Sequence, residues 1–62
     1  MLFKDLIRVL LGGNIELWHN GILVFCGSVF DNNLKTWENL RVLGIMASLT
    51  NSSLVIAVKE VE

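Results

Sequence analysis

Asn20-Gly21 stands between two β-prone runs, and this dipeptide constrains the fold more than any other feature of the sequence. Residues 15–18 precede it and residues 22–26 follow it, and both runs are dominated by aliphatic and aromatic side chains. Asn and Gly both tolerate the positive φ that a two-residue turn requires. The sequence therefore predicts an antiparallel β-hairpin centred on this dipeptide.

The pattern of the hairpin is compatible with two registers. A two-residue turn places Ile15, Leu17, Ile22, Val24 and Cys26 on one face and Trp18, Leu23 and Phe25 on the other. A bulged turn places Ile15, Leu17, Leu23 and Phe25 on one face and Trp18, Ile22, Val24 and Cys26 on the other. In both registers each face carries apolar side chains, whereas the sheet of a free monomer normally keeps one face polar. We therefore expect the second face to be covered by something.

Large aromatic and aliphatic side chains of the hairpin are the candidates for this contact. The candidate protein interface consists of Trp18, Leu23 and Phe25, because tryptophan and other aromatic residues are enriched at interface hot spots. The sequence leaves open whether Trp18 lies at an interface or in the core. Trp37 is interpreted as a core residue.

Helical periodicity marks two further segments. Apolar residues at positions 2, 3, 6, 7 and 10 follow the spacing of an amphipathic helix, which we expect to end at Gly12-Gly13. The sequence Asp31-Asn32-Asn33 is rich in helix-capping side chains, and apolar residues follow at positions 34, 37 and 40. This pattern predicts a short second helix from about Asn33 to Leu40.

The C-terminal third predicts a second hairpin. Residues 42–49 could continue the helix or form a strand. We favour a strand because Val42, Gly44 and Ile45 disfavour a helix by modest amounts, and because the apolar residues at positions 43, 45, 47 and 49 alternate with those at 42, 44, 46 and 48. Residues 50–53 form a polar turn and residues 54–58 are a β-prone run. The expected fold is a single α+β domain over residues 1–62: helix, β-hairpin, short helix and β-hairpin, with the helices packed on a small, mainly antiparallel sheet.

The length and composition of the chain predict association. With 62 residues, 53% of them hydrophobic, and a mean hydropathy of +0.61, the chain is short and apolar. Domains of this size usually need disulfides, a metal or oligomerisation for stability. Cys26 is the only cysteine and His19 the only histidine, so neither a disulfide within the chain nor a four-ligand zinc set is expected. Oligomerisation and an unusually apolar core are the remaining routes.

No group of residues predicts catalysis. Cys26 and His19 lie near opposite ends of the predicted hairpin, roughly 13 Å apart at the strand rise, so a buried structural cysteine and a turn histidine are the preferred interpretation. Gly12-Gly13 follows a helix, whereas a phosphate-binding loop precedes one. We therefore expect no catalytic, cofactor-binding or metal-binding residues, no cofactor and no enzymatic activity.

Charge and hydropathy also exclude two classes of partner. The net charge is −1 and the basic residues are dispersed, whereas nucleic-acid binding needs a basic patch. The uncharged stretch from Val42 to Val58 is interrupted by five polar residues at positions 48 and 50–53, so it does not predict a membrane-spanning helix. We expect a cytoplasmic protein that binds neither nucleic acid nor membranes.

The order of segments resembles a group of very short, uncharacterised phage and prophage proteins of Gram-positive bacteria. The resemblance rests on residues 3–7 (FKDLI), 15–21 (IELWHNG), 26–29 (CGSV) and 54–58 (LVIAV), and this chain departs from it in the apolar Ile22 and Cys26, where such proteins tend to carry charges. Small phage proteins commonly act by occluding a host or defence protein. The resemblance thus implies an antidefence or host inhibitor located in the host cytoplasm.

These observations lead to one main hypothesis and two alternatives. The main hypothesis is a non-enzymatic, phage-type interaction protein that binds and inhibits or modulates a host or defence protein as a homo-oligomer. The first alternative is a structural or accessory protein that assembles only with itself. A small nucleic-acid-binding module is the second alternative, and the charge distribution disfavours it.

Overall fold

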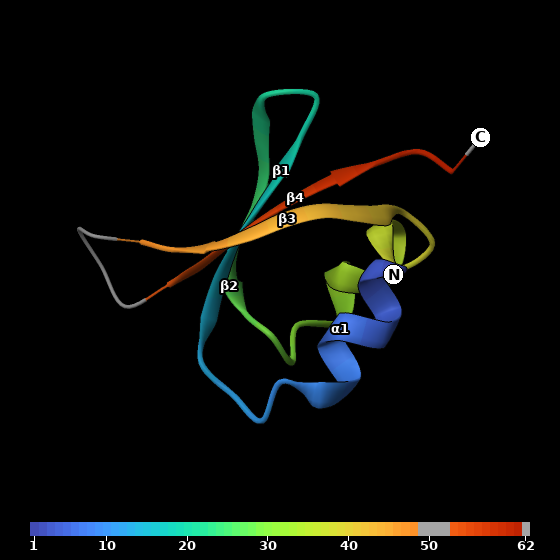
Figure 1. Cartoon of the computed structure of the whole chain (residues 1–62). Coiled ribbons are helices and arrows are strands. Elements are labelled where there is room, and N and C mark those ends of the chain that lie inside the picture. The colour runs from blue at the N-terminus through green and yellow to red at the C-terminus, as the bar shows by residue number, and fades with distance from the viewer. Residues whose placement is uncertain (49–52, 62) are drawn as a thin grey trace.

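The computed structural model describes residues 1–48 and 53–61 and contains one α-helix, one 3₁₀ helix and a four-stranded sheet (Figure 1). The elements are α1 (Phe3–Val9), β1 (Asn14–His19), β2 (Ile22–Ser28), the 3₁₀ helix η1 (Asn32–Trp37), β3 (Arg41–Ala47) and β4 (Leu54–Lys59). The predicted α+β class and the order of elements are confirmed. The expected polar turn at residues 50–53 lies largely outside the described residues.

The sheet has the strand order β2-β1-β4-β3, so the two hairpins lie side by side. Within each hairpin the strands are antiparallel, and the hairpins join through a parallel pairing of β1 with β4. The central pair of strands is thus parallel although the sheet is mainly antiparallel. β2 and β3 form its two edges.

The first hairpin combines the two registers that the sequence allowed. Asn20 (φ 54°) and Gly21 (φ 77°) form the two-residue turn, and Trp18 pairs with Leu23 as the two-residue register predicts. The register then shifts between Leu17 and Trp18, so that Leu17 pairs with Phe25. This shift leaves Val24 as the extra residue of a bulge, and beyond it the second predicted register applies.

The core lies between the sheet and the two helices, which are on the same side of the sheet (Figure 1). Its buried side chains come from α1, η1, β1, β4 and the segment after β2: Phe3, Leu6, Ile15, Leu17, Val29, Leu34, Ile56 and Val58. Alternation along β1 and β4 places the buried residues of these two strands on one face of the sheet, which we call the covered face.

Nearby groups accept hydrogen bonds from N–H groups at the start of both helices. Asp31 caps η1, since its carboxylate accepts a hydrogen bond of 2.8 Å from the Asn33 N–H. At the start of α1, the Phe3 N–H donates to the carbonyl of Leu40 at 2.7 Å. η1 ends at Trp37, so the second helix is shorter than the predicted range to Leu40. Residues 38–40 instead lead into β3 and dock the first turn of α1.

Candidate protein-binding face

The second face of the sheet carries apolar residues from all four strands, with Glu16 among them and the charged pair Arg41 and Lys59 at one end. Trp18 pairs with Leu23 and with Ala57, Ala57 pairs with Gly44, and Val55 pairs with Met46. Paired residues on neighbouring strands project from the same side of a sheet. We call this surface the open face and define it by Trp18, Leu23, Gly44, Met46, Val55 and Ala57.

The open face is opposite the helical layer. Trp18 alternates with the buried Leu17, and Val55 and Ala57 flank the buried Ile56. Both α1 and η1 contact the other side of the sheet (Figure 1). Within residues 1–48 and 53–61, no element forms a second layer over the open face. The molecule is therefore a two-layer structure with one apolar sheet face exposed.

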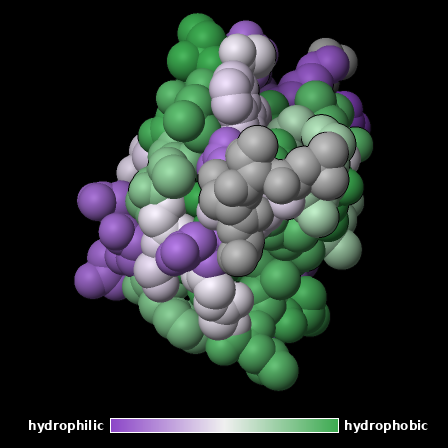
Figure 2. Space-filling view, turned by 90° about the vertical axis from the view of Figure 1, so that its left-hand side faces the viewer, coloured by the Kyte–Doolittle hydropathy of each residue, from purple (hydrophilic) through white to green (hydrophobic). Residues whose placement is uncertain are grey.

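A shallow hollow lies on the part of the open face formed by β3 and β4. Its volume is about 320 Å³, and it is lined by Gly44, Ile45, Met46, Val55 and Ala57. A Cβ atom added to Gly44 would meet no atom within 4 Å. The space above Gly44 is therefore open and belongs to the hollow. Figure 2 views the molecule from the left-hand side of Figure 1, and apolar surface covers much of this view. The lining is almost entirely apolar.

Two side chains of the predicted interface lie on the open face, and the third lies elsewhere. Trp18 is half-buried and Leu23 is exposed there. Phe25 is on the covered face because the bulge at Val24 reverses the direction of the following side chains. Its ring packs against Trp37 with centroids 5.9 Å apart and planes at 52°. Trp37 itself packs against the core from η1.

The second hairpin supplies the residues of the open face that the sequence analysis did not name. Gly44, Met46, Val55 and Ala57 alternate with covered-face residues along β3 and β4. The alternation was visible in the sequence. Their adjacency to Trp18 depends on the parallel pairing of β1 with β4, for which no local signal exists.

The two residues weighed for nucleophilic catalysis are not brought together. His19 pairs with Ile22 beside the turn, whereas Cys26 pairs with Glu16 further along the hairpin. Cys26 is exposed, so the expectation of a buried cysteine is wrong. It projects from the same side as Trp18 on the edge strand β2, and its partner Glu16 also pairs with Val55, so one carboxylate lies within the open face.

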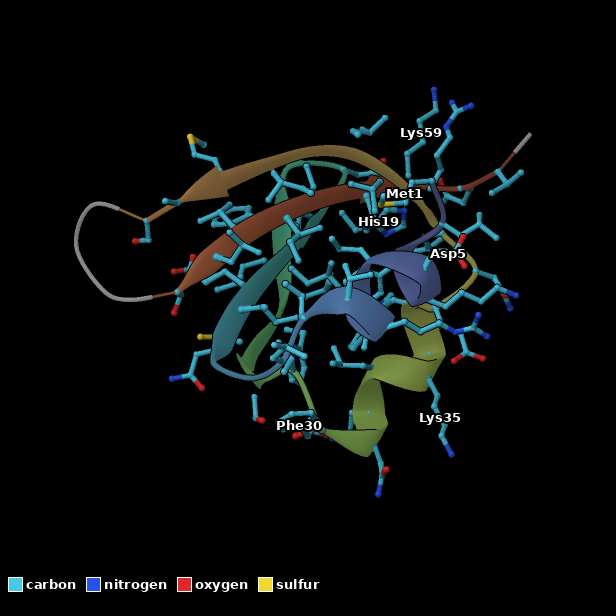
Figure 3. The ribbon with its side chains drawn as sticks, turned by 60° about the horizontal axis from the view of Figure 1, so that its bottom comes forward. Met1, Asp5, His19, Phe30, Lys35 and Lys59 are labelled. Atoms are coloured by element: carbon cyan, nitrogen blue, oxygen red, sulfur yellow. The ribbon has the colours of Figure 1, made fainter. Side chains whose placement is uncertain are left out.

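The polar contacts of His19 lie at the end of the sheet. His19 Nε2 is 2.9 Å from Glu60 Oε1. Figure 3 shows His19 at one end of the molecule, far from Phe30 at the other. A main-chain hydrogen bond at Glu60 and the His19 side chain lower the pKa of the Glu60 carboxyl group. Glu60 is exposed, so solvent weakens this pair. The arrangement is a surface contact that fastens the end of β4 to β1.

Residues 1–48 and 53–61 form neither a metal-binding cluster nor a membrane-spanning helix. No group of three or more His, Cys, Asp or Glu side chains is placed to hold a metal ion there. In that same part of the chain, no helix has the length and apolar character needed to cross a membrane. The Trp18 Nε1 is buried and has no hydrogen-bond partner among these residues.

Comparison with known proteins adds no assignment to this geometry. No protein-family model matches the chain, and neither the curated proteins nor the solved structures contain a match.

Proposed function

We propose that this chain is a non-enzymatic binding domain that docks on another protein through the open face. The single observation that carries the proposal is the exposure of this apolar sheet face, whose opposite side already holds both helices. Large contiguous apolar patches on soluble proteins mark interaction sites. The apolar residues of the open face are of this kind.

Two features of the open face suit it to a protein partner. Trp18 is a residue type enriched at interface hot spots, and it lies next to Ala57 at the margin of the hollow. Hot-spot side chains usually insert into apolar pockets of the partner. The hollow of about 320 Å³ can accept one bulky apolar side chain in return.

We further propose that the bound protein is a host or defence protein and that binding inhibits it. The support for this step is the resemblance to very short phage and prophage proteins. Inhibition by steric occlusion requires a complementary surface and no reactive group. A domain with an apolar docking face and a compact fold is sufficient for such a role.

The experiment compares two neighbouring residues of β2 that project from opposite faces. Leu23→Lys places a charge on the open face, and Ile22→Lys places the same charge on the other side of the strand. Ile22 is 65% exposed and Leu23 is 43% exposed, so the fold should tolerate a lysine side chain at either position. Tagged versions of the unchanged chain and both variants are used to recover proteins from a bacterial lysate, with quantification by mass spectrometry.

We expect one protein to be recovered by the unchanged chain and by Ile22→Lys, and to be reduced at least about tenfold with Leu23→Lys, because a buried unpaired charge opposes binding. Circular dichroism verifies that both variants are folded. Equal recovery by Leu23→Lys and Ile22→Lys would rule out the open face as the docking surface. A second experiment tests the inhibitory role. The unchanged chain and the same two variants are expressed in a bacterium that is challenged with phage, and the efficiency of plaquing is measured for each.

A further inference from the structure

β3 is an edge strand that is exposed along most of its length. It lies at the end of the order β2-β1-β4-β3, and Leu43, Ile45 and Met46 are 59%, 48% and 65% exposed. Edge strands present unpaired main-chain N–H and C=O groups, and native proteins usually protect them with charges, proline or a covering element. From Val42 to Ala47 this strand contains no charged residue and no proline.

The direction of the main-chain groups in β3 can be read from two hydrogen bonds. The Ser48 N–H donates to the Ser53 carbonyl at 3.0 Å and therefore points across the hairpin toward the β4 side. N–H and C=O groups alternate in direction along a strand, so those of Met46 also point toward β4 and those of Ile45 and Ala47 point away from it. Ile45 and Ala47 thus direct their main-chain groups outward from the edge.

The first part of this edge already binds a strand. The Val42 N–H points outward and donates to the Met1 carbonyl at 2.8 Å, and Leu2 forms an antiparallel bridge with Arg41. The bulge between Val42 and Gly44 accounts for the change in alternation along β3. Met1 lies at the same end of the sheet as Lys59 (Figure 3). Within the described part of the chain, nothing continues it along Ile45 and Ala47.

We propose that a second copy of this chain fills the remaining edge, with the two β3 strands antiparallel and related by a twofold axis at Met46. In this register Ile45 of each copy faces Ala47 of the other. The outward N–H and C=O groups of Ile45 and Ala47 in both copies then form four main-chain hydrogen bonds between the two chains. The dimer would contain one continuous eight-stranded sheet.

The charge distribution is compatible with this symmetric pairing. No charged residue occurs between Arg41 and Lys59, so the twofold axis brings no like charges together along the paired segment. Like charges directly opposite each other would destabilise the pair. The apolar side chains of Ile45 and Met46 instead lose exposed surface to their counterparts. Identical apolar segments with outward-pointing groups at alternate positions are self-complementary in this orientation.

The dimer leaves the open face available. A twofold axis that relates two antiparallel strands of one sheet is perpendicular to that sheet, so both helical layers lie on one side. The two open faces then lie next to each other on the other side. The inference therefore goes beyond the proposed function, and each can fail without the other.

The main test uses two substitutions at one position. Ala47→Pro removes an outward N–H without removing a hydrogen bond between β3 and β4, because proline is tolerated where the N–H of an edge strand faces solvent. Ala47→Val retains the N–H and is the matched control. Light scattering should give twice the single-chain mass of 6.9 kDa for the unchanged chain and for Ala47→Val at high micromolar concentration. Ala47→Pro should raise the dissociation constant about tenfold or more.

A disulfide test checks the register and does not depend on the proline variant. In a Cys26→Ser background, Met46→Cys places two thiols on a pair whose Cα atoms are about 4.5–5.5 Å apart, within disulfide range. Leu43→Cys is the control of similar exposure, since its two copies would be offset by about 20 Å along the strands. Mild oxidation should covalently link the Met46→Cys dimer and leave the Leu43→Cys chains unlinked.

Three results would overturn the inference. The first is a mass of 6.9 kDa for the unchanged chain at every concentration. The second is a dimer that persists in folded Ala47→Pro, and the third is equal crosslinking at Met46→Cys and Leu43→Cys. A dimer that is abolished by Leu23→Lys but not by Ala47→Pro would place the second copy on the open face and would also contradict the β3 pairing.

Discussion

At the scale of single residues, the glycines of the two hairpins have different roles. Gly21 has a φ of 77° in the turn, a backbone conformation that residues with a Cβ rarely adopt. Gly44 lies in β3 without a positive φ, and it is one of the residues that line the hollow. Neither position would bring a new Cβ within 4 Å of another atom, so backbone strain alone distinguishes them.

We therefore predict opposite effects of the same substitution. Gly21→Ala should lower the free energy of unfolding by about 1–2 kcal/mol because alanine is strained at positive φ. Gly44→Ala should leave it unchanged or raise it by about 0.4–1 kcal/mol, because alanine reduces the entropy of the unfolded chain. Chemical denaturation of the two variants measures both values. Equal effects would mean that the turn does not impose the observed φ on Gly21.

At the scale of elements, η1 is attached to the sheet largely through Trp37 and Leu34. Trp37 packs against Phe25 of β2 and against the core, whereas Trp18 projects from the other side of the sheet. The two tryptophans thus belong to different layers. One contributes to the docking of a helix and the other to the open face.

Truncation of each tryptophan should affect a different property. Trp37→Ala removes a contact between η1 and the sheet and should cost about 2–3 kcal/mol of stability, less than a fully buried aromatic residue. Trp18→Ala should cost less stability and should weaken binding through the open face by about 2 kcal/mol. Denaturation midpoints and binding assays on both variants separate the two effects. A larger loss of stability for Trp18→Ala would mean that Trp18 is a core residue.

At the scale of the whole molecule, the chain has a small core and two uncompensated features, an open face and an unprotected edge. Only eight hydrophobic residues among those described are buried. A fold of this size gains little net stability from its own core. Association through β3 would add stability to the folded state, because the second copy binds only folded chains.

The thermal midpoint should consequently depend on protein concentration. Because each copy acts as a ligand of the other, a hundredfold rise above the dissociation constant adds about 2.7 kcal/mol per site by mass action. Differential scanning calorimetry over a wide concentration range should show a rising midpoint for the unchanged chain. For Ala47→Pro the midpoint should change little. A constant midpoint for the unchanged chain would indicate that folding and association are not linked.

The sequence by itself determined the local elements, because their signals are local. Asn20-Gly21 specifies the turn through its tolerance of positive φ, and Asp31 specifies the start of η1 through its side-chain hydrogen bond. Alternation of apolar residues predicted strands with two apolar faces. The same alternation indicated that the second face would carry large apolar side chains, and the open face carries Trp18, Leu23 and Met46.

Only the tertiary structure decided which apolar residues share a face and which strands are neighbours. The bulge at Val24 reverses the direction of Phe25, because one extra residue moves every following side chain to the other face. The parallel pairing of β1 with β4 unites Trp18 with Ala57, which are far apart in the sequence. The parallel pairing of β1 with β4 forms when the helices cover one side of both hairpins. The shared core that results joins residues far apart in the sequence, so no local pattern predicts it.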